Sequence, residues 1–253
     1  MVKKNKETAV GSQNRTVTPN EAKSALEHCI KLQRPIMMWG APGIGKSDIV
    51  KQVADGENRP VIDIRLPLWE PTDIKGIPYY NSKENNMVWA SPAELPTDPK
   101  SHAIVFLDEL NSAAPAVQAA AYQLILNRRV GQYVLPEGVA IVAAGNRDSD
   151  KGVTYRMPAP LANRFVHIEL RVDYDDWLQW ATDRKIHADV VGYCTFAKQD
   201  LYDFDPKGSS RSFATPRSWS FVSQLLSDDL PESTLTDLVA GCVGEGLAVK
   251  FMN

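Results

Sequence analysis

Residues 40–47 constrain this chain more strongly than any other segment. They form a complete phosphate-binding loop of the pattern G-x-x-x-x-G-K-[ST], with an apolar run at 35–39 before it and a helical pattern over 47–55 after it. The glycines let backbone N–H groups turn toward phosphate oxygens, and the following helix N-terminus faces the same anion. Lys46 can reach the β- and γ-phosphates, and the Ser47 hydroxyl can ligate Mg²⁺. The alternative, a glycine-rich turn with one surface lysine, does not explain this order of strand, loop and helix. We therefore predict a nucleotide site formed by Gly40, Ala41, Pro42, Gly43, Ile44, Gly45, Lys46 and Ser47.

The composition argues against several classes of protein. Of 253 residues, 43% are hydrophobic and 23% are charged, as in ordinary globular chains, and the net charge of −3 does not favour a nucleic-acid binder. No apolar run reaches the roughly 18 residues that span a bilayer, and no apolar segment follows the basic N-terminus as in a signal peptide. Cys29, Cys194 and Cys242 are odd in number and far apart, which predicts free thiols in a reducing compartment, hence a cytoplasmic protein without a cysteine metal site.

Alternating strand and helix patterns predict an α/β fold. Short apolar runs typical of strands covered on both faces occur at 36–39, 61–64, 103–107, 139–144 and 166–170, and helical patterns at 47–55 and 115–127 separate several of them. We expect a three-layer αβα nucleotide-binding domain over residues 18–172 with a parallel five-stranded sheet. Ligands bind such sheets at the carboxyl ends of the strands, where Gly40, Asp108 and Asn146 are expected.

The remaining segments complete the predicted organisation. Residues 1–17 are polar and predict a flexible tail, and Thr18, Pro19 and Glu21 form a capping box that opens a helix through about residue 33. The stretch 66–99 is too long for a passive connection, and 130–134 is typical of a small hairpin. After Arg171 the strand patterns stop. Helical patterns at 173–184, 188–199, 216–227 and 233–250 predict a small all-α domain over 173–253.

Polar side chains follow two of the predicted strands. We expect Asp108 to hold the hydration shell of Mg²⁺ opposite Ser47, and Glu109 to orient and deprotonate an attacking water. A solvated acidic turn is the alternative, which a position about sixty residues behind a phosphate loop disfavours. Asn146 can hold the same water or contact the γ-phosphate, and its alternative role is a Gly-Asn turn after a strand.

Two arginines are candidates whose roles the sequence leaves open. Arg164 precedes the last predicted strand and could reach a neighbouring subunit's γ-phosphate in a ring, or form a surface salt bridge instead. Arg217 opens a helix of the predicted all-α domain and could reach the phosphates from there, or be an ordinary exposed arginine of a first helical turn.

Together these residues resemble the AAA+ ATPases, specifically the MoxR and dynein-related branch. The resemblance covers about residues 18–225 and includes the Walker B block at 104–119, the D-x-x-G segment at 73–76 and the hairpin region at 130–136. The chain departs from the family at Ser112, where arginine is frequent, and at 145–148, where Gly-Asn-Arg-Asp replaces the usual Q-N-P run. The resemblance implies that Lys46 and Ser47 belong to Walker A, Asp108 and Glu109 to Walker B, and that Asn146 is sensor 1, Arg164 the arginine finger and Arg217 sensor 2.

The same resemblance implies a P-loop NTPase core with a helical lid and a homo-hexameric ring that binds ATP and Mg²⁺ between subunits. Such rings remodel a protein client, often one with a von Willebrand factor A domain, or insert a metal cofactor. A nucleic-acid-translocating motor remains an alternative, although Arg128 and Arg129 are its only local support. Another alternative is a nucleotide-gated binding module with little turnover. The presence of Asp108, Glu109 and Asn146 argues against it. A kinase is less favoured, because no second substrate pocket is evident.

Overall fold

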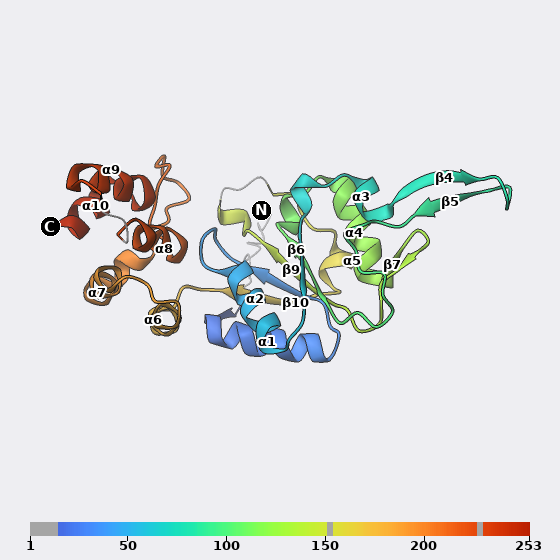
Figure 1. Cartoon of the computed structure of the whole chain (residues 1–253), viewed down its shortest axis with the longest axis horizontal. Coiled ribbons are helices and arrows are strands. Elements are labelled where there is room, and N and C mark those ends of the chain that lie inside the picture. The colour runs from blue at the N-terminus through green and yellow to red at the C-terminus, as the bar shows by residue number, and fades with distance from the viewer. Residues whose placement is uncertain (1–14, 151–153, 227–229) are drawn as a thin grey trace, which may run out of the picture.

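A parallel sheet forms the centre of the computed structural model, which describes residues 15–150, 154–226 and 230–253. The sheet has six strands in the order β1-β10-β2-β9-β6-β3, and all neighbours run parallel. Their bounds are β1 Thr16–Val17, β2 Ile36–Trp39, β3 Val61–Arg65, β6 Ile104–Asp108, β9 Ala140–Gly145 and β10 Val166–Leu170. The predicted α/β fold with a parallel sheet is therefore confirmed (Figure 1).

The predicted number of five strands was wrong, because β1 adds a sixth. Thr16 and Val17 pair with Glu169 and Leu170 of β10, and Arg171 N donates to Val17 O at 3.0 Å. This pairing satisfies backbone groups that β10 would otherwise leave open as an edge strand. Residues 16–17 of the predicted tail thus belong to the sheet, and residues 1–14 lie outside the described residues.

Helices cover both faces of the sheet. Because successive strand residues point to opposite faces, Met37 joins one buried cluster whereas Ile36 and Met38 join the other. The Met38 face packs against α1 (Pro19–Lys31) and α2 (Lys46–Gly56). The Met37 face packs against α3 (Pro71–Lys75), α4 (Pro115–Asn127) and α5 (Ala159–Ala162).

Two antiparallel hairpins extend from the core. The long insertion forms the 3₁₀ helix η1 (Leu66–Leu68), α3 and the hairpin of β4 (Ile77–Asn81) and β5 (Asn86–Ala90), which projects away from the sheet (Figure 1). The predicted small hairpin is confirmed as β7 (Arg129–Val130) and β8 (Tyr133–Val134). Trp89 N donates to Gln132 Oε1 at 3.1 Å, so the two hairpins are joined.

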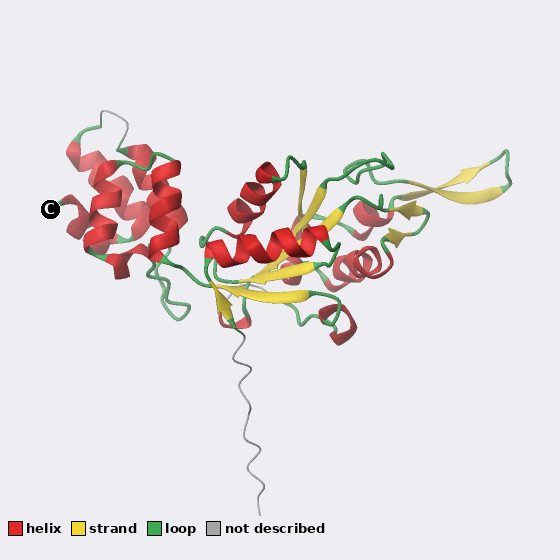
Figure 2. Cartoon of the chain, turned by 90° about the horizontal axis from the view of Figure 1, so that it is seen from below, coloured by secondary structure: helices red, strands yellow, loops and turns green. Residues whose placement is uncertain are grey.

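The C-terminal part is helical, as predicted (Figure 2), and packs around its own buried cluster, which includes the fully buried Trp219. One predicted helix, 233–250, was wrong in its continuity. It breaks at Gly244, whose φ of 95° lies in the left-handed region that favours glycine and ends the helical turn. The elements are α6 (Tyr174–Asp183), α7 (Ala188–Phe196), η4 (Lys198–Leu201), α8 (Pro216–Leu225), α9 (Glu232–Val243) and α10 (Glu245–Met252). Within the ranges the structure describes, none of the helices combines the length and apolar character required to cross a membrane.

Candidate nucleotide-binding site

The phosphate loop takes its shape from glycines with positive φ. Gly43 has a φ of 78° and Gly45 a φ of 97°, conformations that other residues adopt only with strain. Gly43 also has no room for a side chain, because an added Cβ would lie 2.6 Å from Thr215 Oγ1. Helix α2 begins at Lys46, within the last two residues of the loop motif, which turns the helix N-terminus toward the position of an anion.

Lys46 lies at the centre of the site. Its ammonium donates to the Gly40 carbonyl at 2.5 Å, the Ala41 carbonyl at 3.0 Å and Asn146 Oδ1 at 3.2 Å. Burial lowers the pKa of Lys46 to about 8, and the Asp108 carboxylate opposes part of that shift. The structure thus brings Lys46 and Asn146, which are far apart in the sequence, into direct contact.

This lowered pKa predicts that nucleotide binding takes up a proton. Phosphate oxygens near the ammonium favour its charged form, so binding at a pH close to 8 should raise the pKa of Lys46 and protonate the free amines. We expect the affinity for ATP to fall as the pH rises above 8, since more of the free protein then carries a neutral lysine.

Calorimetry at pH 8.5 in two buffers of different ionisation enthalpy measures this uptake directly. The same titration at pH 7 is the control, because there the free Lys46 is already charged and the contribution from this residue should be smaller. Equal proton uptake at both pH values would contradict the assignment of the lowered pKa to the phosphate-binding amine.

Ser47 and Asp108 form the candidate metal site. Ser47 Oγ donates to Asp108 Oδ2 at 3.2 Å, so the start of α2 meets the end of β6 at the carboxyl edge of the sheet. A hydroxyl and a carboxylate are oxygen ligands of the kind that Mg²⁺ prefers. The donor set therefore fits the ion that the sequence predicted.

Glu109 is held in an unusual backbone conformation next to this pair. Its φ of 55° and ψ of 37° are left-handed, which costs a residue with a side chain roughly 1 kcal/mol or more. Its amide donates to Asp108 Oδ1 at 2.9 Å, while its exposed carboxylate has no hydrogen-bond or ion-pair partner among the described residues. Strain at such a position is characteristic of functional sites, and the carboxylate is free to accept a proton.

A residue to which the sequence assigned no role in the site holds Asn146 in place. Asn111, in the 3₁₀ helix η2 (Leu110–Ser112) and almost fully buried, donates through Nδ2 to Asn146 O at 2.8 Å. Its Oδ1 accepts from Asn146 N at 3.2 Å. The side-chain amide thus pairs with both backbone groups of Asn146, as a neighbouring strand would, and fixes where the Asn146 side chain points. Its place two residues after Glu109 was the available signal.

Arg147 is a second residue to which the sequence assigned no role in the site. Its guanidinium binds both carboxylate oxygens of Asp150 and reaches Glu169 Oε1 at 3.0 Å. The Asp150 carboxylate, followed by Glu169, raises the pKa of Arg147 further above its usual value. Because Asp150 ends the 3₁₀ helix η3 (Asp148–Asp150) and Glu169 lies on β10, the departure from the Q-N-P run ties the exit of β9 to β10, on the other side of β2 in the sheet.

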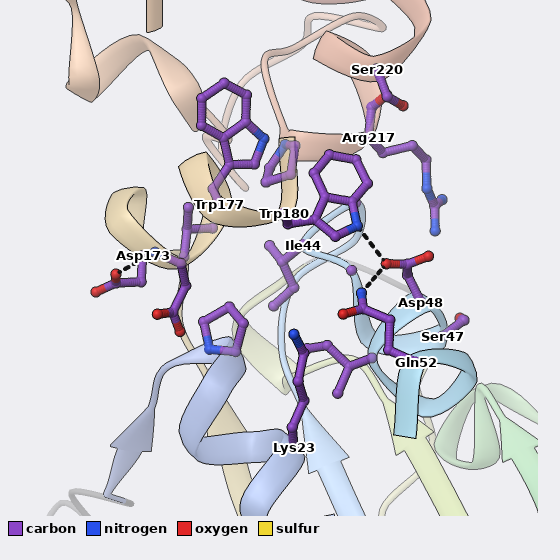
Figure 3. A pocket seen from close by; sticks show the side chains of 17 residues that line it. Lys23, Ile44, Ser47, Asp48, Gln52, Asp173, Trp177, Trp180, Arg217 and Ser220 are labelled. Atoms are coloured by element: carbon purple, nitrogen blue, oxygen red, sulfur yellow. Dashed lines mark hydrogen bonds between the residues drawn. The ribbon is translucent and has the colours of Figure 1, made fainter. Parts of the chain in front are cut away.

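The helical part closes the site from the other side. Arg217 N donates to Gly43 O at 3.2 Å, and the Thr215 side chain caps α8 by accepting from Ser218 N at 3.1 Å. Figure 3 shows the Arg217 side chain extending from α8 on the side of the pocket where Ser47 and Asp48 lie. The pocket continues between the start of α1 and α6, where Trp180 Nε1 donates to Asp48 Oδ2 at 2.8 Å.

A known protein family matches the sequence of this chain over the segment that contains the site. The sequence profile of the family described as "AAA domain (dynein-related subfamily)" matches residues 35–165, from the strand before the phosphate loop to the start of β10. The chain belongs to this family. The predicted membership in the AAA+ ATPases is thereby confirmed.

Individual proteins resemble the AAA domain over parts of their length. Midasin from Giardia intestinalis is 29% identical over 174 residues, which are 63% of this chain and 4% of midasin. A structure of the RuvB Holliday junction branch migration motor of Thermotoga maritima has a TM-score of 0.51 at 18% identity, over 92% of this chain and 67% of that one. A single-substitution mutant of the same RuvB has a TM-score of 0.52 at 16% identity over the same shares of both chains. At such identities the RuvB likeness shows the fold alone.

Arg164 is the one predicted site residue that the AAA domain does not bring to its own phosphate loop. It lies in the turn between α5 and β10, at the amino end of β10, whereas the loop follows the carboxyl end of β2. The four residues of β2 separate these ends by about 13 Å. Its side chain is exposed and has no hydrogen-bond or ion-pair partner in the described part of the chain.

Proposed function

We propose that this AAA domain binds ATP with Mg²⁺ and hydrolyses it at the interface between two subunits of a ring. The observation that carries the proposal is the convergence of Lys46, Ser47, Asp108 and Asn146 beside a carboxylate, Glu109, that has no partner within the described ranges. In this proposal, residues 18–172 form the nucleotide-binding domain and residues 173–253 form its helical lid.

Each side chain has a defined part in the proposed reaction. Lys46 binds the β- and γ-phosphates in place of the two loop carbonyls, and Asn146 holds the attacking water or the γ-phosphate. Ser47 and Asp108 would hold the Mg²⁺, which when bound neutralises charge on the phosphates. Glu109 takes the proton from the water, whose oxygen forms a bond to the γ-phosphorus as the bond to the β-phosphate oxygen breaks, leaving ADP and phosphate.

Two arginines complete the proposed site from outside the sheet. Arg217 contacts the phosphates from the lid, since its own backbone already bonds to the phosphate loop. Arg164 reaches the γ-phosphate bound to the adjacent subunit, because it is exposed, has no partner among the described residues and lies too far from its own loop. A homo-hexamer is the closed ring that we propose, in keeping with the family resemblance.

The finer role that we propose is ATP-driven remodelling of a protein client, in the manner of MoxR proteins. A client with a von Willebrand factor A domain is the candidate that the resemblance favours. Both proposals rest on family membership, and the projecting β4–β5 hairpin is a surface by which a client could be contacted.

Glu109→Gln tests the proposed chemistry. The amide keeps the size of the side chain but cannot accept a proton, so we expect ATP turnover to fall about 100-fold or more while ATP affinity stays near that of the unmodified protein. Phosphate release and equilibrium binding of labelled ATP measure the two quantities.

Glu94→Gln is the matched control, since Glu94 is an exposed carboxylate in the insertion, away from the phosphate loop. Unchanged phosphate release by Glu109→Gln would show that Glu109 is not the base. Because this variant should retain ATP, pull-down with it in the presence of ATP is also the experiment that identifies a client.

A further inference from the structure

A histidine on β10 connects the end of the nucleotide-loop strand to the turn that carries Arg164. His167 Nδ1 accepts from Trp39 Nε1–H at 2.8 Å, and His167 Nε2 bonds to the Ala162 carbonyl at 2.7 Å. An indole N–H can only donate and a carbonyl can only accept. The two bonds together therefore require a neutral imidazole with its hydrogen on Nε2.

The ring contacts hold the histidine in this orientation. The Trp39 and His167 rings are nearly parallel, with centroids 6.0 Å apart and an interplanar angle of 15°, and Phe165 meets the imidazole edge-on at 6.1 Å. Trp39 is the last residue of β2 and directly precedes Gly40 of the phosphate loop. The imidazole is thus fixed from the loop side by a side chain that belongs to the strand leading into the loop.

On its other side, His167 acts on the backbone just before Arg164. Ala162 is the last residue of α5, and its carbonyl already accepts from Phe165 N at 3.2 Å. Strand β10 is likewise held by its own ladder, beginning with Val166 N donating to Pro35 O at 2.9 Å. The histidine bond is therefore not required to satisfy the carbonyl or to pair the strand, and what it adds is a restraint on the turn.

We propose that His167 is a positioning residue for Arg164, with Trp39 fixing the imidazole. The restraint orients the turn of residues 162–165 so that the exposed guanidinium points at the adjacent subunit's nucleotide. This inference rests on the proposed function, in which Arg164 acts in trans. It assigns His167 of one subunit an effect on turnover in the neighbouring site.

The test uses mixed rings of two inactive proteins. Lys46→Ala subunits are donors, which supply Arg164 but bind no nucleotide, and Arg164→Ala subunits are acceptors, which bind nucleotide but lack the arginine. ATP turnover recovered on mixing measures the arginine acting across the interface. His167→Ala is then added either to the donor or to the acceptor.

We expect His167→Ala in the donor to lower the recovered turnover about three- to tenfold, as for the loss of one orienting hydrogen bond. When His167→Ala is placed in the acceptor instead, the loss of recovered turnover should be clearly smaller. The acceptor already carries Arg164→Ala, so its histidine has no arginine to orient. Trp39→Phe keeps an aromatic ring and removes the N–H donor, so it should show a weaker loss with the same asymmetry.

His102→Ala is the matched control, because that exposed histidine contacts the Asn58 carbonyl at the far side of the sheet and should change neither position. Equal losses from His167→Ala in donor and acceptor would indicate a merely structural role and overturn the inference, as would no loss in the donor. If donor and acceptor subunits that both keep His167 recover no turnover on mixing, the proposed action of Arg164 in trans is itself wrong. This outcome distinguishes failure of the proposed function from failure of the role of His167.

Discussion

Arg164→Ala subunits are expected to hydrolyse ATP about 1000-fold more slowly than the unmodified protein, the lower end of the effect of such arginines in GTPases. Their affinity for ATP should stay nearly unchanged. The reason is position: Arg164 is separated from its own loop by the length of β2, and its exposed side chain has no hydrogen-bond or ion-pair partner among the described residues. We therefore expect it to add nothing to ATP binding within one subunit, and its charge to act only when a second subunit brings a γ-phosphate to it.

Steady-state phosphate release and equilibrium binding of labelled ATP separate these two effects. Arg34→Ala is the matched control, because Arg34 is an exposed arginine just before β2, at the same end of the sheet. A variant that loses ATP affinity as strongly as turnover would place Arg164 in its own site. Normal turnover in Arg164→Ala would remove it from the mechanism altogether.

Lys46→Ala is expected to weaken ATP binding about 1000-fold, the sum of two charge-assisted hydrogen bonds to phosphate at about 2 kcal/mol each. Turnover should then fall below detection at millimolar ATP. In the protein without nucleotide the ammonium donates to two loop carbonyls and to Asn146, so alanine also leaves those acceptors without their donor.

Binding of labelled ATP, together with thermal unfolding, shows which effect dominates. Lys51→Ala is the control, since Lys51 lies on the exposed side of the same helix α2. If Lys46→Ala retains an affinity within a few-fold of the unmodified protein, residues 40–47 do not form the phosphate site. Loss of folding, visible as a lowered melting temperature without ATP, would instead assign the effect to the three internal bonds.

Local patterns sufficed for the parts of the fold and site that depend on neighbouring residues. The glycines of the loop, the apolar run before Asp108 and the capping box at Thr18 each specify a conformation within a few residues. The carboxyl ends of β2, β6 and β9 then follow from the parallel sheet, which explains why Gly40, Asp108 and Asn146 could be expected together.

Contacts between distant residues could not be predicted in the same way. The Asn111 amide meets the backbone of Asn146, and His167 meets Trp39, only because η2 and β9, or β2 and β10, become neighbours in the folded sheet. Strand β1 is too short to leave a periodic pattern. In the sequence, Gly244 cannot be distinguished from a glycine inside a helix. Its positive φ in the structure shows that it separates α9 from α10.

The bond between Arg217 N and Gly43 O joins main chain to main chain across the pocket. No side-chain exchange other than to proline removes such a donor. A swing of the C-terminal helices therefore has to break this tether or drag the glycine loop with it. While this bond is intact, movement of those helices and reshaping of the glycine loop are therefore a single mechanical event.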